Sequence, residues 1–436
     1  MPSSSQPIDD SQAARITSSC PPSTSEILQA AWDHDVAAVS KLLDKPGKAS
    51  VQDPTTGETP LHAAIRSCGP ATSTPSDEAA LEQAKATVSE LLLWGGIWND
   101  VDDHNETPGC VAYRLGQTAL YTLCVEAGMR AEMLFGLLDG YQELSSGSEA
   151  DDEDMAEDEE PAHVEVDTAG MNPELEDGED APDLPAEPTF SPPENGTESE
   201  VKSEKYLRSK LTYSDGKLVD DDGNGVMMAW ETDIMRRSVD ALIPEHAPGK
   251  RILNIGFGMG IIDSMFADTK PARHHIIEAH EEVLAHLDEP ESTFGANWEA
   301  SGPEEGAYKV HKGRWQDIVP VLLERGEIYD AVYFDTFGEA YSQLRKFFTE
   351  YVPGLLEADG VFGFFNGLGA DRRICYDVYT KVVELHLTDA GMDVDWQEID
   401  VDLQGLEEAG KGEWEGVKRR YWTLDKYRLP ICTFLG

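Results

Sequence analysis

The stretch RILNIGFGMGII, residues 251–262, decides the fold of the second half of the chain. Its first residues form a short apolar run that fits a buried strand. Gly256, Gly258 and Gly260 follow in a G-x-G-x-G spacing, directly before a helical pattern. Glycines let the chain turn tightly and let a ligand approach the backbone, while the start of a helix offers unpaired N–H groups. The pattern predicts a nucleotide-binding loop between a strand and a helix.

Strand and helix patterns alternate on both sides of this loop. We expect further strands at 274–280, 308–313, 329–337, 360–368, 394–402 and 419–434. We expect helices, among others, at 281–287, 343–356 and 376–391. This order is the βαβ signature of a doubly wound, Rossmann-like α/β sheet, and the last two strands are expected to form an antiparallel hairpin that closes its edge.

The residues near the loop distinguish between the cofactors that use such a loop. Glu278 lies 18 residues beyond Gly260, at the end of the second strand, where a carboxylate can bind ribose hydroxyls. The dinucleotide fingerprint prefers glycine or alanine where this chain has Ile262. An acid after the fourth strand, here Asp335, and a closing hairpin are instead typical of methyltransferases. S-adenosylmethionine is therefore favoured over NAD.

The segment KGRWQDIVP, residues 312–320, follows the third strand, where adenine lies in this fold. We expect Trp315 to lie against the adenine ring and Gln316 or Asp317 to meet its amino group. The alternative for Trp315 is a purely structural place in the core.

The composition excludes several classes of function. The chain of 436 residues carries 84 acidic and 34 basic side chains, which give a net charge of −50. We therefore expect no direct nucleic-acid partner, whereas the charge favours a basic protein as a partner. It has no apolar run long enough to span a membrane, and its six scattered cysteines form no zinc-binding or disulfide pattern. We expect a soluble, monomeric protein of the cytoplasm and nucleus, without a metal.

Composition also divides the chain into four parts. Residues 1–22 are rich in Ser and Pro and are expected to be disordered, residues 23–143 are helical in pattern, and residues 199–436 hold the glycine loop. Residues 144–198 are expected to be a disordered acidic linker, since nine of the twelve residues from Glu149 to Glu160 are Asp or Glu. The linker is either a solvated spacer or a docking tail for a basic partner.

The helical part resembles ankyrin repeats. GETPLHAAI, residues 57–65, contains the T-P-L-H-x-A core of that repeat, and NETPGCVA, residues 105–112, is a degenerate second copy. The second Thr-Pro comes 48 residues after the first, and an insertion around residues 69–80 explains the excess over the usual period. The resemblance implies a module for interaction with another protein.

Five motifs in the second half resemble one enzyme family. They are GVMMAWETDIM (225–235), NIGFGMGI (254–261), IIEAH (276–280), GRWQD (313–317) and YFDTFGE (333–339). In this order they resemble guanidinoacetate N-methyltransferases. They resemble more closely the fungal type IV protein arginine N-methyltransferases, which modify the delta nitrogen of arginine.

The resemblance implies a Rossmann-like methyltransferase domain that uses S-adenosylmethionine. It implies an acceptor arginine in a basic protein, of which a ribosomal protein is one example. It implies that Glu231 and Asp335 hold the guanidino group of the acceptor. The residues that it places at the cofactor are Tyr206, Met227, Met235, Gly256, Phe257, Gly258, Met259, Gly260, Ile261, Glu278, Ala279, His280, Trp315, Gln316 and Asp335.

The chemistry of the acceptor supports two carboxylates at this position. A guanidinium is a cation with a pKa above about 12, and carboxylates bind it through charge-assisted hydrogen bonds. A buried carboxylate such as Glu231 is costly unless a cation pairs with it. The alternatives are an exposed glutamate at a helix start for Glu231 and a strand-end cap for Asp335.

Two other functions stay open at this point. One is a small-molecule methyltransferase of the guanidinoacetate type, and the other is an ankyrin scaffold with an inactive methyltransferase domain. Asp233, Ile234 and the segment FNGLGADRR (365–373) depart from the small-molecule enzyme and suit a bulkier acceptor. The double-glutamate and Thr-His-Trp loops of the common protein arginine methyltransferases are not found in the sequence.

Overall fold

The computed structural model describes residues 8–44, 47–71, 78–138, 203–214, 216–290, 292–403, 414–418 and 420–436. By their contacts, Met1–Gly140 and Val201–Gly436 form one compact unit. The predicted linker, residues 144–198, lies outside the described residues. The domain boundaries expected from composition therefore stay predictions.

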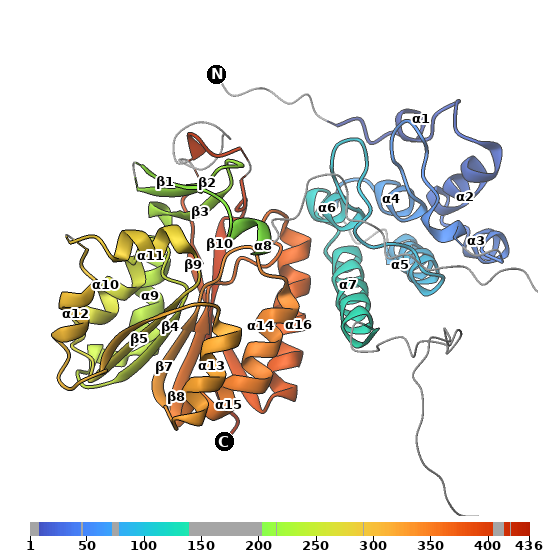
Figure 1. The fold of residues 1–436 in the computed structure, drawn as a ribbon. Helices are drawn as coiled ribbons and strands as arrows, with labels where there is room; N and C mark the ends of the chain where they lie inside the picture. Colours follow the sequence, from blue (N-terminus) through green and yellow to red (C-terminus); the bar gives the residue numbers. More distant parts are fainter. Residues whose placement is uncertain are drawn as a thin grey trace, which may run out of the picture. The chain divides into compact units, whose positions relative to one another are not determined.

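A seven-stranded sheet forms the centre of the second half, in the order β6-β5-β4-β7-β8-β10-β9 (Figure 1). Its strands are β4 (Arg251–Ile255), β5 (Arg273–Glu278), β6 (Tyr308–Lys312), β7 (Tyr329–Phe334), β8 (Leu356–Phe364), β9 (Met392–Asp400) and β10 (Lys426–Phe434). The first five strands pair in parallel, and β10 is antiparallel to both β8 and β9. The Rossmann-like sheet with an antiparallel edge is therefore confirmed.

Helices cover both faces of this sheet because successive residues of each strand point to opposite sides. Ile252 packs with helices α9 (Thr232–Leu242) and α10 (Ile261–Asp268). Its neighbour Leu253 packs with the other set of helices. These are α13 (Trp315–Glu324), α14 (Tyr341–Lys346), the π-helical turn η5 (Phe347–Tyr351), α15 (Val352–Leu355) and α16 (Arg373–Asp389). The predicted helix at 281–287 is α11 (Glu281–Leu287), and α12 spans Ala296–Ala300.

A second, smaller sheet precedes the large one and was not predicted from the sequence. It contains β1 (Leu211–Ser214), β2 (Lys217–Asp220) and β3 (Gly225–Met228), all antiparallel. Figure 1 shows it at the end of the large sheet where the parallel strands finish. The 3-10 turn η3 (Ala229–Glu231) leads from β3 into α9. The short helices α8 (Ser203–Tyr206) and η4 (Pro244–His246) complete this half.

The first half is helical, as predicted. It contains α1 (Gln12–Arg15), α2 (Pro22–Trp32), α3 (Val36–Leu42), η1 (Lys48–Ser50), α4 (Pro60–Arg66), α5 (Glu78–Leu93), α6 (Pro108–Arg114) and α7 (Thr118–Leu138). The two Thr-Pro motifs begin α4 and α6, because Thr59 and Thr107 cap these helices and a proline occupies the first turn of each. His62 Nε2 bonds the carbonyl of Glu106 at 2.9 Å and so links the two motifs. Ankyrin-repeat character stays a prediction.

The expectation that residues 1–22 are disordered was wrong for residues 8–22. This segment contains α1, and Arg15 at its end is buried. Its guanidinium bonds Glu58 at 3.1 Å and Asp102 at 2.8 Å. Composition alone misses this order because contacts with distant residues hold the segment, namely the ion pairs of Arg15 and the packing of Ile16 and Cys20 against the core.

Glu58 lies between two buried guanidinium groups. It accepts a hydrogen bond of 3.1 Å from Arg15 and one of 3.1 Å from Arg66, and none of the three side chains is more than 2% exposed. Burial raises the pKa of Glu58 to about 7, and the two arginines oppose that rise. The network joins α1, the turn before α4 and α4 itself.

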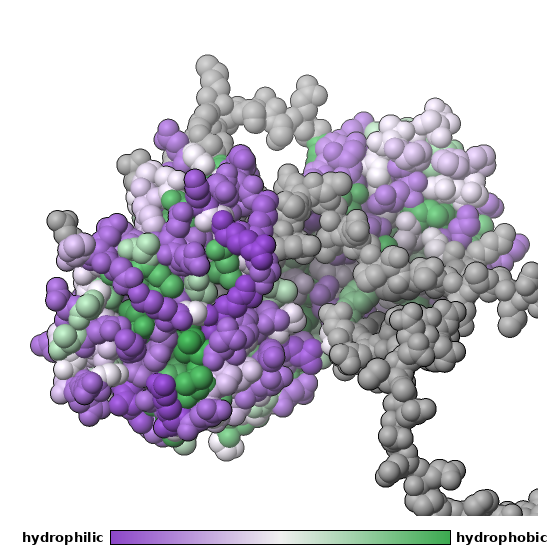
Figure 2. All heavy atoms as spheres, viewed as in Figure 1, coloured by the Kyte–Doolittle hydropathy of each residue, from purple (hydrophilic) through white to green (hydrophobic). Residues whose placement is uncertain are grey.

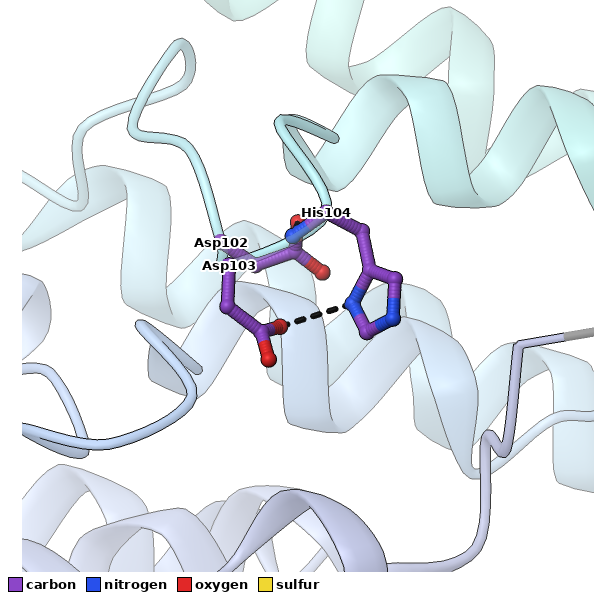
Figure 3. A group of neighbouring side chains, drawn as sticks. All are labelled: Asp102, Asp103 and His104. Carbon is purple, nitrogen blue, oxygen red and sulfur yellow. Dashed lines mark hydrogen bonds and ion pairs between the residues drawn. The ribbon is translucent and has the colours of Figure 1, made fainter. Parts of the chain in front are cut away.

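Asp102, Asp103 and His104 form the one group in the described chain whose side chains are close enough to share a metal ion (Figure 3). Arg15 already occupies their position, because its nitrogens lie 2.8 Å from Asp102, 2.9 Å from Asp103 and 3.0 Å from His104. A guanidinium and a metal ion cannot both take these ligands, so the group serves the ion network.

Two surface properties accompany the fold. Within the described residues, no helix combines the length and the apolar character needed to cross a membrane. Figure 2 shows a mostly hydrophilic face over the second half, with hydrophobic residues in separate small patches.

Substitution of Glu58 by alanine is expected to lower the free energy of unfolding by about 3 kcal/mol, because it leaves two buried guanidinium groups undercompensated. The matched control is Glu82→Ala, which breaks an exposed pair of 2.7 Å with Lys85 on α5 and is expected to cost less than about 1 kcal/mol. Urea denaturation measures both values. Equal losses in the two variants would contradict the role given to Glu58.

Gly256→Ala is expected to lower the free energy of unfolding by about 3 kcal/mol or more, since strain and overpacking add. Gly256 has φ +94°, and a Cβ there would lie 1.8 Å from the carbonyl oxygen of Asp335. Gly249→Ala is the control, because Gly249 has φ +82° but open space around it. We expect it to cost only about 1–2 kcal/mol. If both substitutions cost the same in urea denaturation, the contact with Asp335 does not matter.

Candidate active site

A cavity of about 290 Å³ lies at the carboxyl ends of the parallel strands. The small sheet, η3, the loops after β4, β5, β7 and β8, and the segment before β10 all contribute to its wall. The sequence-predicted residues that line it are Tyr206, Met227, Glu231, Gly256, Gly258, Glu278, Ala279, Trp315, Gln316 and Asp335. Residues from six separate parts of the chain therefore meet in one place.

The glycine loop after β4 forms the floor of the cavity. Gly256, Gly258 and Gly260 have φ of +94°, +55° and +70°, a region that residues with a side chain avoid. A Cβ on Gly258 would lie 2.6 Å from the terminal methyl of Met227. The sulfur of Met227 also accepts the backbone N–H of Met259 at 3.3 Å. The small sheet thus closes onto the loop through one methionine.

Glu278 lies at the end of β5, beside this loop, and its carboxylate is held by backbone donors. It accepts the N–H groups of Phe257 at 2.9 Å, Ala279 at 2.7 Å and His280 at 2.6 Å. These bonds fix the carboxylate at the rim of the loop, where its remaining lone pairs can accept ribose hydroxyls.

The opposite end of the cavity suits an adenine ring. The Trp315 ring packs against Phe334 and Phe347 in the core, and its indole N–H donates to Glu339 at 3.0 Å. Trp315 is therefore both a core residue and a wall of the cavity. Gln316 also donates to Glu339, at 3.0 Å, whereas its Oε1 is buried and has no hydrogen-bond partner in the described chain. An unpaired buried acceptor fits the amino group of adenine.

Glu231 and Tyr421 form the acceptor end. Glu231 is 3% exposed, so the alternative of an exposed helix-start glutamate is wrong. The Tyr421 hydroxyl donates to Oε1 of Glu231. Burial raises the pKa of Glu231 well above its usual value, and the negative charge of Asp335 raises it further. The site therefore holds an acid that favours a nearby cation.

Asp335 is the second carboxylate at this end. It follows β7 directly, and its backbone N–H donates to the carbonyl of Ile255 at 2.8 Å. Burial raises the pKa of Asp335 to about 7, with a further contribution from the charge of Asp263. Neither Glu231 nor Asp335 forms an ion pair with any residue of the described chain.

Six predicted cofactor residues lie outside the cavity wall. Met235 is in the core between α9 and the sheet, where it packs with Val239 and Leu242 of the same helix. His280 caps α11 and bonds the carbonyl of Tyr206 at 2.9 Å, so it supports the wall from behind. The loop residues Phe257, Met259, Gly260 and Ile261 shape the loop without lining the cavity.

The sequence predictions missed several residues of the wall. Tyr421 lies 190 residues from Glu231, in the segment 419–434 that was predicted as a strand, whereas the strand β10 begins only at Lys426. Glu339 belongs to the quoted YFDTFGE motif, and its position four residues after Asp335 was a signal that could have found it. Phe337, Phe365 and Leu368 also line the cavity.

These features meet the requirements of S-adenosylmethionine. The glycines leave room for the ligand against the backbone, Glu278 suits the ribose, and the unpaired oxygen of Gln316 suits the adenine.

Comparison with known proteins finds one family model and a number of similar solved structures. Residues 198–390 match the family described as Guanidinoacetate N-methyltransferase. The O-methyltransferase TomG from Streptomyces achromogenes, solved in complex with SAM, is similar over 48% of this chain and 82% of its own, with 17% identity and a TM-score of 0.32.

The fungal relatives match nearly the whole chain. "Protein arginine N-methyltransferase 2" of Neurospora crassa is 65% identical over 430 residues, which are 98% of this chain and 99% of that protein. The protein of the same name in Gibberella zeae is 63% identical over 98% of this chain and 96% of its own, and that of Yarrowia lipolytica is 36% identical over 87% and 84%. S-adenosylmethionine is the cofactor of this site. The chain belongs to the protein arginine N-methyltransferase 2 family.

Proposed function

We propose that this arginine methyltransferase transfers the methyl group of S-adenosylmethionine to the delta nitrogen of arginine in a protein. The observation that carries the proposal is a pair of carboxylates, the buried Glu231 and the half-buried Asp335, which share one cavity without an ion pair in the described chain. A guanidinium group supplies the missing positive charge.

The residues of the chain bind and orient the acceptor. S-adenosylmethionine supplies an electrophilic methyl group. Glu231 and Asp335 accept hydrogen bonds from the guanidinium and concentrate its positive charge on the nitrogens that they bind. The Tyr421 hydroxyl and a backbone hydrogen bond from Met228 hold the Glu231 carboxylate in place, and no ion pair in the described chain neutralises its charge. Positioning supplies most of the rate in such a displacement, and either carboxylate can receive the released proton.

The delta nitrogen follows from which N–H groups the carboxylates take. Arginine has five N–H donors, four of them on the two terminal nitrogens. When Glu231 and Asp335 take the terminal N–H groups, the internal nitrogen is the one left without a carboxylate partner. That nitrogen therefore keeps the electron density that the methyl transfer needs.

The charges of the cavity favour arginine within a protein over a small acceptor that carries its own carboxylate. Arg314 is the one cationic side chain among the described residues of the wall, and it pairs with Glu204 at 2.6 Å. The four carboxylates of the wall, Glu231, Glu278, Asp335 and Glu339, repel an acetate group. A basic protein, such as a ribosomal protein met in the cytoplasm or the nucleus, suits this charge.

Guanidinoacetate is the second candidate acceptor, because residues 198–390 match the family named after its methylation. The inactive scaffold is a weaker alternative. The cavity contains the features that cofactor binding needs. They are glycines with positive φ, a Glu278 held by backbone N–H groups, and Trp315 and Gln316 bonded to Glu339. The N-terminal helices are proposed to recruit the protein substrate to a monomeric enzyme.

The test offers labelled S-adenosylmethionine and purified protein either guanidinoacetate or a basic protein fraction of a fungal extract. Acid hydrolysis and mass spectrometry are expected to identify δ-N-methylarginine from the protein fraction. Glu231→Gln is expected to lower turnover by about 100-fold or more while cofactor affinity, measured by calorimetry, stays within about twofold. The exposed Glu324→Gln on α13 is the control. Label in creatine alone, or on a terminal nitrogen of arginine, refutes the proposal.

The proposal also predicts a pH dependence. We expect kcat/KM for the acceptor to rise as the pH is raised through about 7, because Asp335 has a pKa raised to about 7 and binds the cation only when ionised. Below about pH 7, kcat/KM is expected to fall by about tenfold per pH unit where the protonation of a single group controls it. Calorimetric titration of the cofactor at each pH is the control. A flat profile between about pH 6 and about pH 8 contradicts the assigned role of Asp335.

A further inference from the structure

Three polar side chains without any exposed surface lie beneath the glycine loop. They are Asn254 on β4, Asp263 on α10 and His274 on β5. Their surroundings are apolar, since α10 packs there through Ile262 and Phe266. Buried polar groups are costly unless hydrogen bonds satisfy them, so this group calls for a role.

Hydrogen bonds connect the three side chains to the loop. Asn254 Nδ2 donates to the carbonyl of Gly256 at 2.9 Å and to Oδ2 of Asp263 at 2.8 Å. His274 Nε2 lies 2.9 Å from Oδ1 of Asp263. His274 Nδ1 has no hydrogen-bond partner in the described chain, which assigns the proton to Nε2 and makes His274 the donor. The chain of bonds runs from β5 through α10 to the first glycine of the loop.

The same group reaches Asp335 by two routes. Gly256, which Asn254 holds, packs so closely on the carbonyl of Asp335 that a Cβ would lie 1.8 Å from its oxygen. The second route is electrostatic, because the negative charge of Asp263 raises the pKa of Asp335. Burial also raises the pKa of Asp263, and the bonds from His274 and Asn254 oppose that rise.

We propose that Asn254, Asp263 and His274 are positioning residues, which fix the cofactor loop and hold a third buried negative charge beneath the carboxylates that bind the acceptor. This proposal rests on the proposed function where it concerns Asp335. His274 itself is enclosed by the rings of Phe266, Phe294 and Trp298.

Asp335 has titratable neighbours besides Asp263, and the substitutions used to test the proposal leave those residues in place. Burial raises the pKa of Glu231 and of four phenols, and the charge of Asp335 adds to each rise; the phenols are those of Tyr206, Tyr333, Tyr421 and Tyr427. These groups come from η3, α8, β7, the segment before β10 and β10 itself. Asp263 differs from them because it also bonds, through Asn254, to the loop.

The decisive variant is Asp263→Asn in the full chain. It removes the charge and keeps the size, so the pKa of Asp335 should fall and the acid limb of the kcat/KM profile should move to lower pH. The dissociation constant of S-adenosylmethionine, measured by calorimetry without acceptor, is expected to rise about threefold to tenfold, since a buried hydrogen bond is altered. If Asp263 had only a structural role, the acid limb of the kcat/KM profile would stay at the same pH.

Asn254→Ala separates the two routes. It removes the donor to Gly256 and leaves the charge of Asp263, so cofactor affinity is expected to fall about threefold to tenfold while the acid limb stays in place. His274→Gln keeps a donor toward Asp263 and is expected to bind the cofactor more tightly than His274→Leu. The control is Asp53→Asn, an equally buried carboxylate of the N-terminal half, which should change neither measurement.

The proposal is overturned if the acid limb of the kcat/KM profile stays at the same pH in Asp263→Asn. It is also overturned if the cofactor affinities of both Asp263→Asn and Asn254→Ala stay within about twofold of that of the unsubstituted chain. If Asp263→Asn does not fold, the affinities of Asn254→Ala and of the two His274 variants decide in the same way. If the unsubstituted chain methylates no arginine, the proposed function fails, whereas the cofactor titrations still decide whether these residues position the loop.

Discussion

The parallel pairing of β4 with β7 is the constraint on which the active site depends. It aligns Ile255 with Phe334, so the residues that follow, Gly256 and Asp335, meet backbone to backbone. No side chain fits between them. The strand order reverses direction at this point, and open α/β sheets bind ligands where it does. The loop assigned to the methyl donor and the carboxylate that we propose for the acceptor are therefore neighbours through the sheet itself, and methyl transfer requires such proximity.

The electrostatics of the cavity come from burial more than from the overall charge of the chain. Desolvation is the largest cause of the raised pKa in both Glu231 and Asp335. A pair of acids in such a place lowers the stability of the empty protein once both are ionised, and an arriving cation removes that penalty. Exposed acids of the described chain interact weakly through water and salt and cannot select arginine over lysine. In the function that we propose, selection belongs to Glu231 and Asp335 and to the planar shape of a guanidinium.

How far the sequence predicts this site depends on whether the information is local. The glycine loop, Glu278 and Asp335 were found because each follows a strand at a spacing that the sheet dictates. Tyr421 could not be found, because its partner is 190 residues away and no periodicity links them. Met235 lies in the apolar core rather than in the cavity wall, and a methionine in the sequence does not distinguish these two places. The order of residues 8–22 was missed because Arg15 pairs with Glu58, Asp102 and Asp103, which are distant in the sequence and do not show in composition.

Glu231 and Glu278 show how one cavity can give two buried glutamates different tasks. Three backbone N–H groups bond Glu278, at 2.6 to 2.9 Å, and so satisfy much of its negative charge before any ligand arrives. That carboxylate suits neutral hydroxyl groups, which need an acceptor in a fixed place. Glu231 has the phenol of Tyr421 as its side-chain partner and faces the charge of Asp335, so it gains most from a cation. Three backbone donors at Glu278, against one backbone hydrogen bond from Met228 at Glu231, therefore suit the first carboxylate to neutral groups and the second to a cation.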